Sequence, residues 1–365
     1  MVRLYPTFVF AKGDWPWLKK VGFLVRSHHQ SIAAPQRSKG LCHLCLAGTA
    51  QYADWSNPDG SWKCDDSLLR PTPPWSRESP LTTRLCKSDD ICGKTWRYRP
   101  DIFHTLHKGV LAELAGSGLV VLTDLNLDGC GGDIPVRLHQ IHVQLKTWCS
   151  HNKVQLHVND LTRTILHFDA DSDFPTGGWF KGADTTAVCK YLEHKFHQTL
   201  ESEHSDYVES IYMALSAGNN FLRLLYSADL FMPQSLTQRV AACGRQLLSQ
   251  YLRAASIAHS LSKTRFKLIP KFHLFCHIVM NLEATSDSKN RSFCINPLAF
   301  SCQLDEDLVG RASGMSRTCS IRRVHEQTIR KYLVAVRLNL PNHGQKRPLS
   351  SEPAERHGPK PKRPR

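Results

Sequence analysis

Four residues in two distant parts of the chain have the types and the spacing of metal ligands. Cys42 and Cys45 form a C-x-x-C unit, from which two thiolates can bind one Zn²⁺ within a tight turn. His273 and His277 stand four positions apart, so on a helix they share one face, one turn from each other. Each pair lacks two ligands for a four-coordinate ion. We therefore predict that the two pairs combine into one structural zinc site.

Each pair also has an ordinary explanation when taken alone. A C-x-x-C unit can serve redox chemistry, but no strand-then-helix pattern of the thioredoxin type surrounds this one. The two histidines could be one buried and one hydrogen-bonded side chain of a helix. No Glu stands beside them in an H-E-x-x-H arrangement, which disfavours zinc peptidase chemistry.

Acidic residues at two further places could bind catalytic Mg²⁺ or Mn²⁺. Asp14 follows a strand predicted at residues 7–10, and carboxylates at strand ends hold the metal ions of nucleases and transposases. The alternative for Asp14 is a cap or turn residue before Trp-Pro. Glu306 lies in a run of acids with Asp305 and Asp307, for which an acidic surface is the usual explanation.

The elements that would position these residues are mostly helices. Apolar residues with helical spacing predict helices over the ranges 185–200, 206–230, 233–261, 271–282 and 326–338. Helices are also predicted at residues 17–25, after a proline, and within 99–125, where Gly116 and Gly118 mark a break or close packing. Residues 135–148 fit either a helix or a strand. Residues 51–100 have little periodicity, which is typical of a functional or disordered connection.

One more polar group begins the helical stretch after residue 99. Asp101, His104 and His107 in RPDIFHTLHKGV are most simply a capped helix start with exposed histidines.

The charge of the chain indicates a polyanionic partner. The net charge is +15, and the tail at residues 341–365 holds seven Lys or Arg and two Glu, so +10 belongs to the rest of the chain. Nucleic acid is the commonest polyanion available. No apolar run reaches the length that crosses a bilayer, so no membrane partner is expected. The thirteen cysteines, without a secretory signal, indicate a reducing compartment.

The tail itself is too polar and Pro-rich to bury a core and is predicted to be disordered. Its basic clusters, Lys346-Arg347 and Lys360 to Arg365, indicate a nuclear import signal, with a merely solubilising tail as the alternative.

In their order along the chain, these motifs resemble CACTA-type and related cut-and-paste DNA transposases. The matching blocks are FAKGDWPWLKKVGFLVRSHHQ with KGLCHLC, then RPDIFHTLHKGV, WFKGADTTAVCKYL, IPKFHLFCHIV and LAFSCQLDEDLVGRASGMSR. They resemble, in turn, the second catalytic block with its C-x-x-C, a D-x-x-H block, a helix start, a K-x-H-x-x-x-H block and the block of the third catalytic acid. The resemblance spans about residues 8–340.

The resemblance implies roles for the candidate residues. These transposases use a ribonuclease-H-like core with an Asp-Asp-Glu metal triad. Asp14 matches the second Asp, and Glu306 matches the final Glu because Gly310 follows four residues later, with Asp305 and Asp307 as alternatives. The two cysteines and two histidines named above match the paired ligands within the family's insertion.

The resemblance also implies a fold. We expect the remnant of an α/β ribonuclease-H-like core with a large, mostly α-helical insertion, helix-rich overall. The expected domains are a partial core (1–40), a zinc knuckle with an irregular segment (41–100), the helical insertion (101–297), C-terminal core helices with Glu306 (298–340) and the disordered tail (341–365). Asp14 and Glu306 should then approach each other.

The expected function follows from one departure from the family. No Asp or Glu precedes Asp14, so the family's first catalytic Asp has no counterpart, and we expect no strand cleavage from this chain alone. We predict a transposase-derived DNA-binding protein in the nucleus, with a homo-oligomer left open. The alternatives are a zinc-stabilised, non-catalytic nucleic-acid-binding protein and a non-functional relic of a mobile element.

Overall fold

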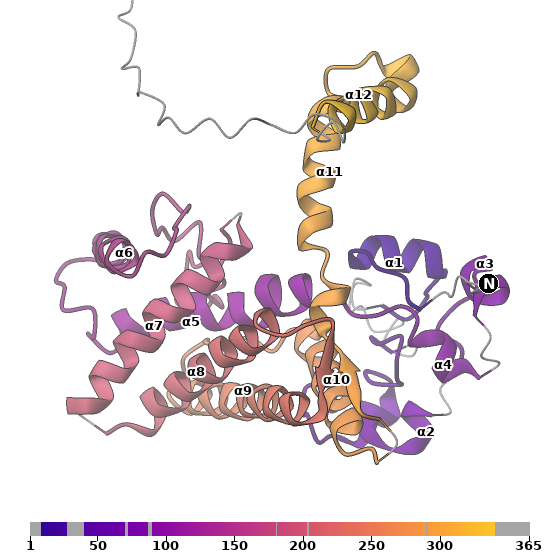
Figure 1. The fold of residues 1–365 in the computed structure, drawn as a ribbon. Helices are drawn as coiled ribbons and strands as arrows, with labels where there is room; N and C mark the ends of the chain where they lie inside the picture. The colour runs from indigo at the N-terminus through magenta and orange to yellow at the C-terminus, as the bar shows by residue number, and fades with distance from the viewer. Residues whose placement is uncertain are drawn as a thin grey trace, which may run out of the picture. The chain divides into compact units, whose positions relative to one another are not determined.

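The computed structural model describes residues 9–27, 40–69, 72–86, 90–179, 181–202, 204–289 and 291–339. The chain divides into two compact units, Met1–Leu304 and Asp305–Arg365. Helices dominate (Figure 1), so the prediction of a helix-rich protein is confirmed. In the described residues, the strands β1 (Phe231–Pro233) and β2 (Phe293–Ile295) pair antiparallel with each other and form a two-stranded sheet. The ribonuclease-H-like core therefore stays a prediction.

The first unit begins with a short capped helix, α1 (Trp15–Gly22). The Oδ1 atom of Asp14 accepts a hydrogen bond from the backbone N–H of Trp17 at 3.0 Å, which satisfies one of the unpaired donors of the first turn. The helix ends earlier than the predicted range of 17–25. The reason is that Phe23 adopts a left-handed conformation with φ of 51°, which closes the helix at its C-terminal end.

The described part of the strand predicted before Asp14 does not form a strand. Residues 7 and 8 lie outside the described residues, and Val9 and Phe10 belong to no strand. A single parallel bridge joins Ala11 to Tyr98, so a continuous neighbouring strand is missing from the described part of this region. A small apolar cluster packs here instead, formed by Ala11, Trp15, Leu18, Leu24 and Tyr98.

The segment before residue 100 contains only short elements, η2 (Ala50–Tyr52), η3 (Ser61–Lys63), α2 (Asp65–Leu68), α3 (Pro80–Leu85) and α4 (Ile91–Thr95). The sequence predicts a functional or disordered connection here, and part of the described segment packs into the core. Trp62 is fully buried and Tyr52 nearly so, and both belong to the main hydrophobic core. A few large rings can anchor a segment that has no periodic apolar pattern.

The main core lies among helices, namely η4 (Phe103–Val110, a π-helix), α5 (Leu111–Asp124), α6 (Ile134–His151), α7 (Gly182–Ser202), α8 (Asp206–Tyr226), α9 (Gln234–Ser260) and α10 (Pro270–Ser286). The four helices predicted between residues 185 and 282 are confirmed. Residues 135–148, left open above, form helix α6, whose buried residues Leu138, Ile141 and Leu145 lie on one face.

Helix α5 lies in the middle of this core, with every residue from Leu111 to Thr123 buried. The helices η4 and α5 meet at a kink, where Lys108 and Gly109 have non-helical backbone angles. Together they span Phe103–Asp124, which is long and apolar enough to cross a bilayer, in contrast to the sequence-based expectation, and 94% of its apolar window is buried inside the protein. A methyl group on Gly116 would lie 2.5 Å from the backbone of Thr176, and one on Gly118 would lie 2.8 Å from Leu192 Cδ1. Close packing, and not a helix break, therefore explains both glycines.

The second unit contains most of α11 (Gln303–Ser316), then η6 (Ile321–Arg323) and α12 (Val324–Asn339). Helix α12 confirms the helix predicted at 326–338. The basic tail at residues 341–365 lies outside the described residues.

Candidate metal centre

The two cysteines are presented by a loop that turns twice with glycine. Gly40 and Gly48 have φ of 80° and 83°, a region that glycine adopts without strain. The N–H of Leu41 donates to the carbonyl of Ala47 at 2.9 Å and closes the loop.

Backbone N–H groups inside this loop point at the two sulfur atoms. The N–H of Leu44 lies 3.3 Å from Cys42 Sγ, and the N–H of Ala47 lies 3.4 Å from Cys45 Sγ. Donors at these positions favour the thiolate form of a cysteine, which is the form that binds metal.

The two histidines are presented by α10, in which Pro270 occupies the first turn. His273 and His277 are one turn apart and project from the same face of the helix, as predicted. The Nδ1 atom of His273 is 2.8 Å from the carbonyl oxygen of Trp55, and a carbonyl can only accept. Nδ1 therefore carries the proton of the neutral ring, and Nε2 presents a lone pair to the sulfur atoms.

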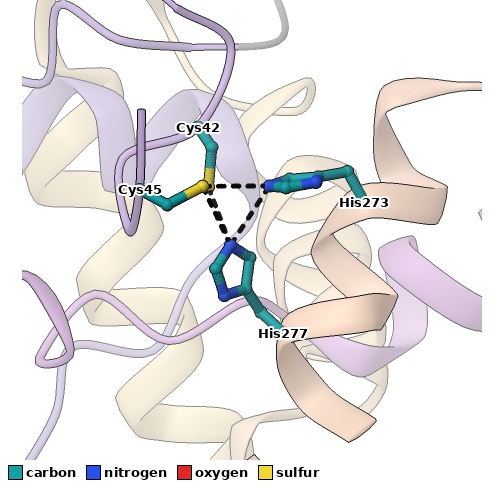
Figure 2. Close-up of side chains that lie close together, drawn as sticks. All are labelled: Cys42, Cys45, His273 and His277. Atoms are coloured by element: carbon teal, nitrogen blue, oxygen red, sulfur yellow. Dashed lines mark hydrogen bonds between the residues drawn. The ribbon is translucent and has the colours of Figure 1, made fainter. Parts of the chain in front are cut away.

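The four donor atoms converge on one point (Figure 2). His277 Nε2 lies 3.4 Å from Cys42 Sγ and 3.3 Å from Cys45 Sγ. His273 Nε2 lies 3.2 Å from Cys45 Sγ and 3.1 Å from His277 Nε2. All four atoms lie within 4.8 Å of one another. Zinc bonds of about 2.3 Å to sulfur and about 2.0 Å to nitrogen give tetrahedral edges of roughly 3.3–3.8 Å, close to these separations.

Hydrogen bonds alone do not account for this cluster. The Nε2 atom of His277 has two sulfur atoms and a second ring nitrogen around it, but a ring nitrogen offers one proton or one lone pair. Each of the four side chains is fully buried, so bulk water does not reach the polar atoms that lack a hydrogen-bond partner in the cluster. A cation at the centre would accept a lone pair from all four donors. The cluster could therefore hold a metal ion, and the predicted meeting of these residues is confirmed.

Aromatic rings surround the cluster. The fully buried ring of Trp62 lies with its centroid 4.4 Å from that of His273 and 5.0 Å from that of His277. Trp96 approaches His277 from another direction, at 6.2 Å. An apolar shell of this kind keeps water from the ion, and four protein ligands leave no coordination position open for a substrate. A metal ion held by all four side chains would therefore be closed off from a substrate.

The protonation of the ligands favours a cation as well. Burial by itself raises the pKa of a thiol, yet the hydrogen bond with Cys45 and the charge of His277 lower the pKa of Cys42 well below its usual value. Burial raises the pKa of Cys45, so this thiol keeps its proton until a metal displaces it. Burial also lowers the pKa of His277, and the neutral form of an imidazole is the form that binds metal.

Sequence reasoning missed one charged residue beside the cluster. Arg26 is only 3% exposed, and its Nε donates to the carbonyl of Cys42 at 2.9 Å while Nη1 donates to the carbonyl of Thr72 at 2.7 Å. A buried guanidinium next to two cysteines stabilises negative charge on sulfur. Arg26 stands sixteen positions before Cys42 in a polar stretch, and no motif marks it.

The predicted catalytic acids lie in different units. Asp14 caps α1 in the first unit, and Glu306 is an exposed residue of the first turn of α11 in the second unit. Asp305 is half-buried, and the side chain of Asp307 lies outside the described part of the chain. The pairing of Asp14 with Glu306 around Mg²⁺ or Mn²⁺ thus stays a prediction.

Asp14 also lines a cleft of about 200 Å³ in the first unit, together with Asp101, His104 and Lys271. Asp101 Oδ2 lies 2.5 Å from His104 Nδ1, and Asp101 Oδ1 accepts the backbone N–H of Cys302 at 2.8 Å. Asp101 also accepts the N–H groups of Phe103 and His104, so the predicted helix cap is confirmed.

One part of the expectation for this segment is wrong. His107 was expected to be exposed, but it is 3% exposed, and burial lowers its pKa to about 4. The ring faces inward, where its centroid lies 5.9 Å from that of Phe103 and 6.2 Å from that of Tyr226.

Comparison of the chain with protein-family models, with curated protein sequences and with solved structures gives no match.

Proposed function

We propose that this chain is a zinc-stabilised nucleic-acid-binding protein related to cut-and-paste DNA transposases. The observation that carries the proposal is the cluster of Cys42, Cys45, His273 and His277, whose donor atoms lie within 4.8 Å of one another although the pairs are more than 200 positions apart. These are the four residues that the resemblance to transposases selects. Their donor set, two thiolates and two imidazoles in a closed arrangement, suits Zn²⁺ better than Mg²⁺ or Ca²⁺, which prefer oxygen.

The role proposed for the ion is to connect two parts of the first unit. One pair of ligands sits on an irregular loop that has few regular hydrogen bonds of its own, and the other sits on the buried helix α10. Zinc would fix the loop to the helix, since the bound ion stabilises only the folded arrangement of the four ligands.

Nucleic acid is the proposed partner because of charge. The chain carries a net charge of +15, and two thirds of this excess lies outside the basic tail. Lysine and arginine bind phosphates and release counterions, so the affinity should fall steeply with salt. The basic clusters of the tail support a nuclear location, which a fluorescent fusion with and without residues 341–365 would test.

A second candidate function is metal-dependent DNA strand cleavage by Asp14 and Glu306. The observation that favours it is the cleft in which Asp14 and Asp101 place two carboxyl groups beside the side chains of His104 and Lys271. Carboxylates in a cleft can bind Mg²⁺ or Mn²⁺ near a scissile phosphate. We favour binding without cleavage, because in the described residues Asp14 belongs to no group of three or more clustered metal ligands.

The test combines metal content, DNA binding and cleavage on the same purified chain. We expect about one zinc per chain, DNA affinity that decreases with salt, and no nicking of supercoiled DNA with Mg²⁺ or Mn²⁺. Nicking by the wild type that is lost in Asp14→Asn would establish the second candidate instead. A zinc-free, folded chain without DNA affinity at moderate salt would contradict the proposal and leave the relic of a mobile element as the better account.

A further inference from the structure

A groove of about 880 Å³ lies among residues of α6, α7 and α8 and shares no lining residue with the metal cluster or with the Asp14 cleft. Three of its lining residues on α7, Lys190, His194 and His197, follow the spacing i, i+4, i+7 and so share one helix face. Their side chains are exposed, although this face adjoins the core. An exposed row of basic and aromatic groups inside a concavity is available to a ligand.

Two pairs of rings lie along this row. The rings of Trp148 and His194 are nearly parallel, with centroids 6.1 Å apart and an interplanar angle of 30°. The rings of His197 and Tyr212 have centroids 5.4 Å apart and an interplanar angle of 57°, so they are tilted and not stacked on each other. Since His194 and His197 are one turn apart on α7, the two pairs, here named platforms, follow each other along the helix. Aromatic side chains in succession are what successive unpaired bases stack on.

The opposite wall, on α8, supplies polar groups. The amide nitrogen of Asn219 donates to Glu193 Oε2 at 2.7 Å, whereas its carbonyl oxygen is buried and accepts no hydrogen bond from the described residues. The contact with Glu193 joins α7 to α8 and fixes this wall of the groove.

A positive charge is held at the same wall. Both Nε and Nη2 of Arg223 donate to Asn220 Oδ1, at 3.3 and 3.0 Å. This contact orients the guanidinium while leaving it exposed, and Lys190 stands on the facing helix. The two cations can bind phosphate groups. A purely apolar ligand would leave both cations without partners.

We propose that this groove binds unpaired nucleotides of a nucleic-acid strand, with bases on the two ring pairs and phosphates at Lys190 and Arg223. A duplex is not the ligand of this site, because its bases are already stacked on one another. The inference rests on the proposed function and deepens it, by assigning the single-stranded part of the substrate to a defined site.

The test uses fluorescence anisotropy with three labelled probes of equal length: an oligothymidylate, the same strand with abasic positions, and a duplex. An oligouridylate of the same length distinguishes RNA from DNA as the source of the nucleotides. The variant Lys190→Gln/Arg223→Gln removes two exposed charges from the groove. The matched control Lys146→Gln/Arg239→Gln removes two exposed charges from α6 and α9 outside it. His194→Ala removes one ring from a platform.

We expect the groove variant to lose about tenfold or more in affinity for oligothymidylate, and the control to lose less than about threefold. The abasic strand and His194→Ala should each weaken binding about fivefold or more, as expected for the loss of one stacked base. Equal losses in the groove variant and the control, or an abasic strand that binds as well as oligothymidylate, would overturn the assignment. A wild-type chain that binds duplex DNA but not oligothymidylate would overturn the assignment of the groove and leave the proposed nucleic-acid binding intact.

Discussion

Removal of the metal should lower the stability of the first unit by an amount that the structure allows one to estimate. The ion would join positions 45 and 273, which are 228 residues apart. In the chain-entropy treatment of cross-links, closing a loop of this length restricts the unfolded chain by about 5 kcal/mol. Because folded proteins are stable by only about 5–15 kcal/mol, loss of the link is a large perturbation. For a domain of this size it corresponds to a decrease in melting temperature of roughly 10–20 °C.

Differential scanning calorimetry of His277→Ala and of chelator-treated wild type measures this decrease. The matched control is Cys276→Ala, which removes a buried thiol from the same helix, 3% exposed, and leaves all four ligands in place. The chelator separates the loss of metal from the loss of the imidazole volume. A melting temperature that is insensitive to chelator would show that no metal link stabilises the first unit. A decrease in melting temperature in His277→Ala no larger than in Cys276→Ala would show the same.

Three further predictions concern other parts of the chain. Burial raises the pKa of Glu113 from 4.5 to about 7, so the folded protein favours the protonated carboxyl group. The stability that Glu113 contributes relative to Gln is therefore fully present below pH 4.5 and is lost as the pH rises through 7. The free energy of unfolding of wild type minus that of Glu113→Gln, measured with urea, should fall by about 3 kcal/mol over this range, and a constant difference would be evidence against it. Gly116→Ala should lower the free energy of unfolding by at least about 2 kcal/mol, because the added methyl group would lie 2.5 Å from the backbone of Thr176. Gly310→Ala, with no atom within 4 Å of its added methyl group, should have no such cost, and equal effects of the two changes would be inconsistent with close packing at α5. Deletion of residues 341–365 removes +5 of the +15 charges and should make the dependence of DNA affinity on salt less steep without abolishing binding, whereas complete loss would place the whole interface in the tail.

The metal ligands could be predicted from the sequence because coordination chemistry fixes their number. A C-x-x-C unit and two histidines one turn apart each supply two of the four ligands of a zinc ion. Because each pair needs two more ligands, we predicted that the two pairs meet in the fold. The shell could not be predicted, since the carbonyl of Trp55 and the ring of Trp62 belong to a segment without periodicity. Arg26 was missed for a similar reason, because the sequence does not show whether an arginine is buried or exposed to solvent.

The long helices were also predictable, because their apolar faces repeat over several turns, as the buried residues of α8 and α9 show. Short elements depend on single backbone angles and on partners distant in sequence. Phe23 ends α1 with a left-handed φ, and Ala11, which directly follows the predicted strand, forms a single bridge with Tyr98. The catalytic acids were supported only by short local patterns and by the resemblance, and neither fixes their distance in the fold.

X-ray absorption at the zinc edge of the purified chain would show whether two cysteines and two histidines bind one zinc ion, because it reports the type and distance of the ligands. We expect about one zinc per chain, with two sulfur neighbours at about 2.3 Å and two nitrogen neighbours at about 2.0–2.1 Å. A zinc-free folded chain, or a zinc ion surrounded by oxygen and without sulfur, would contradict it.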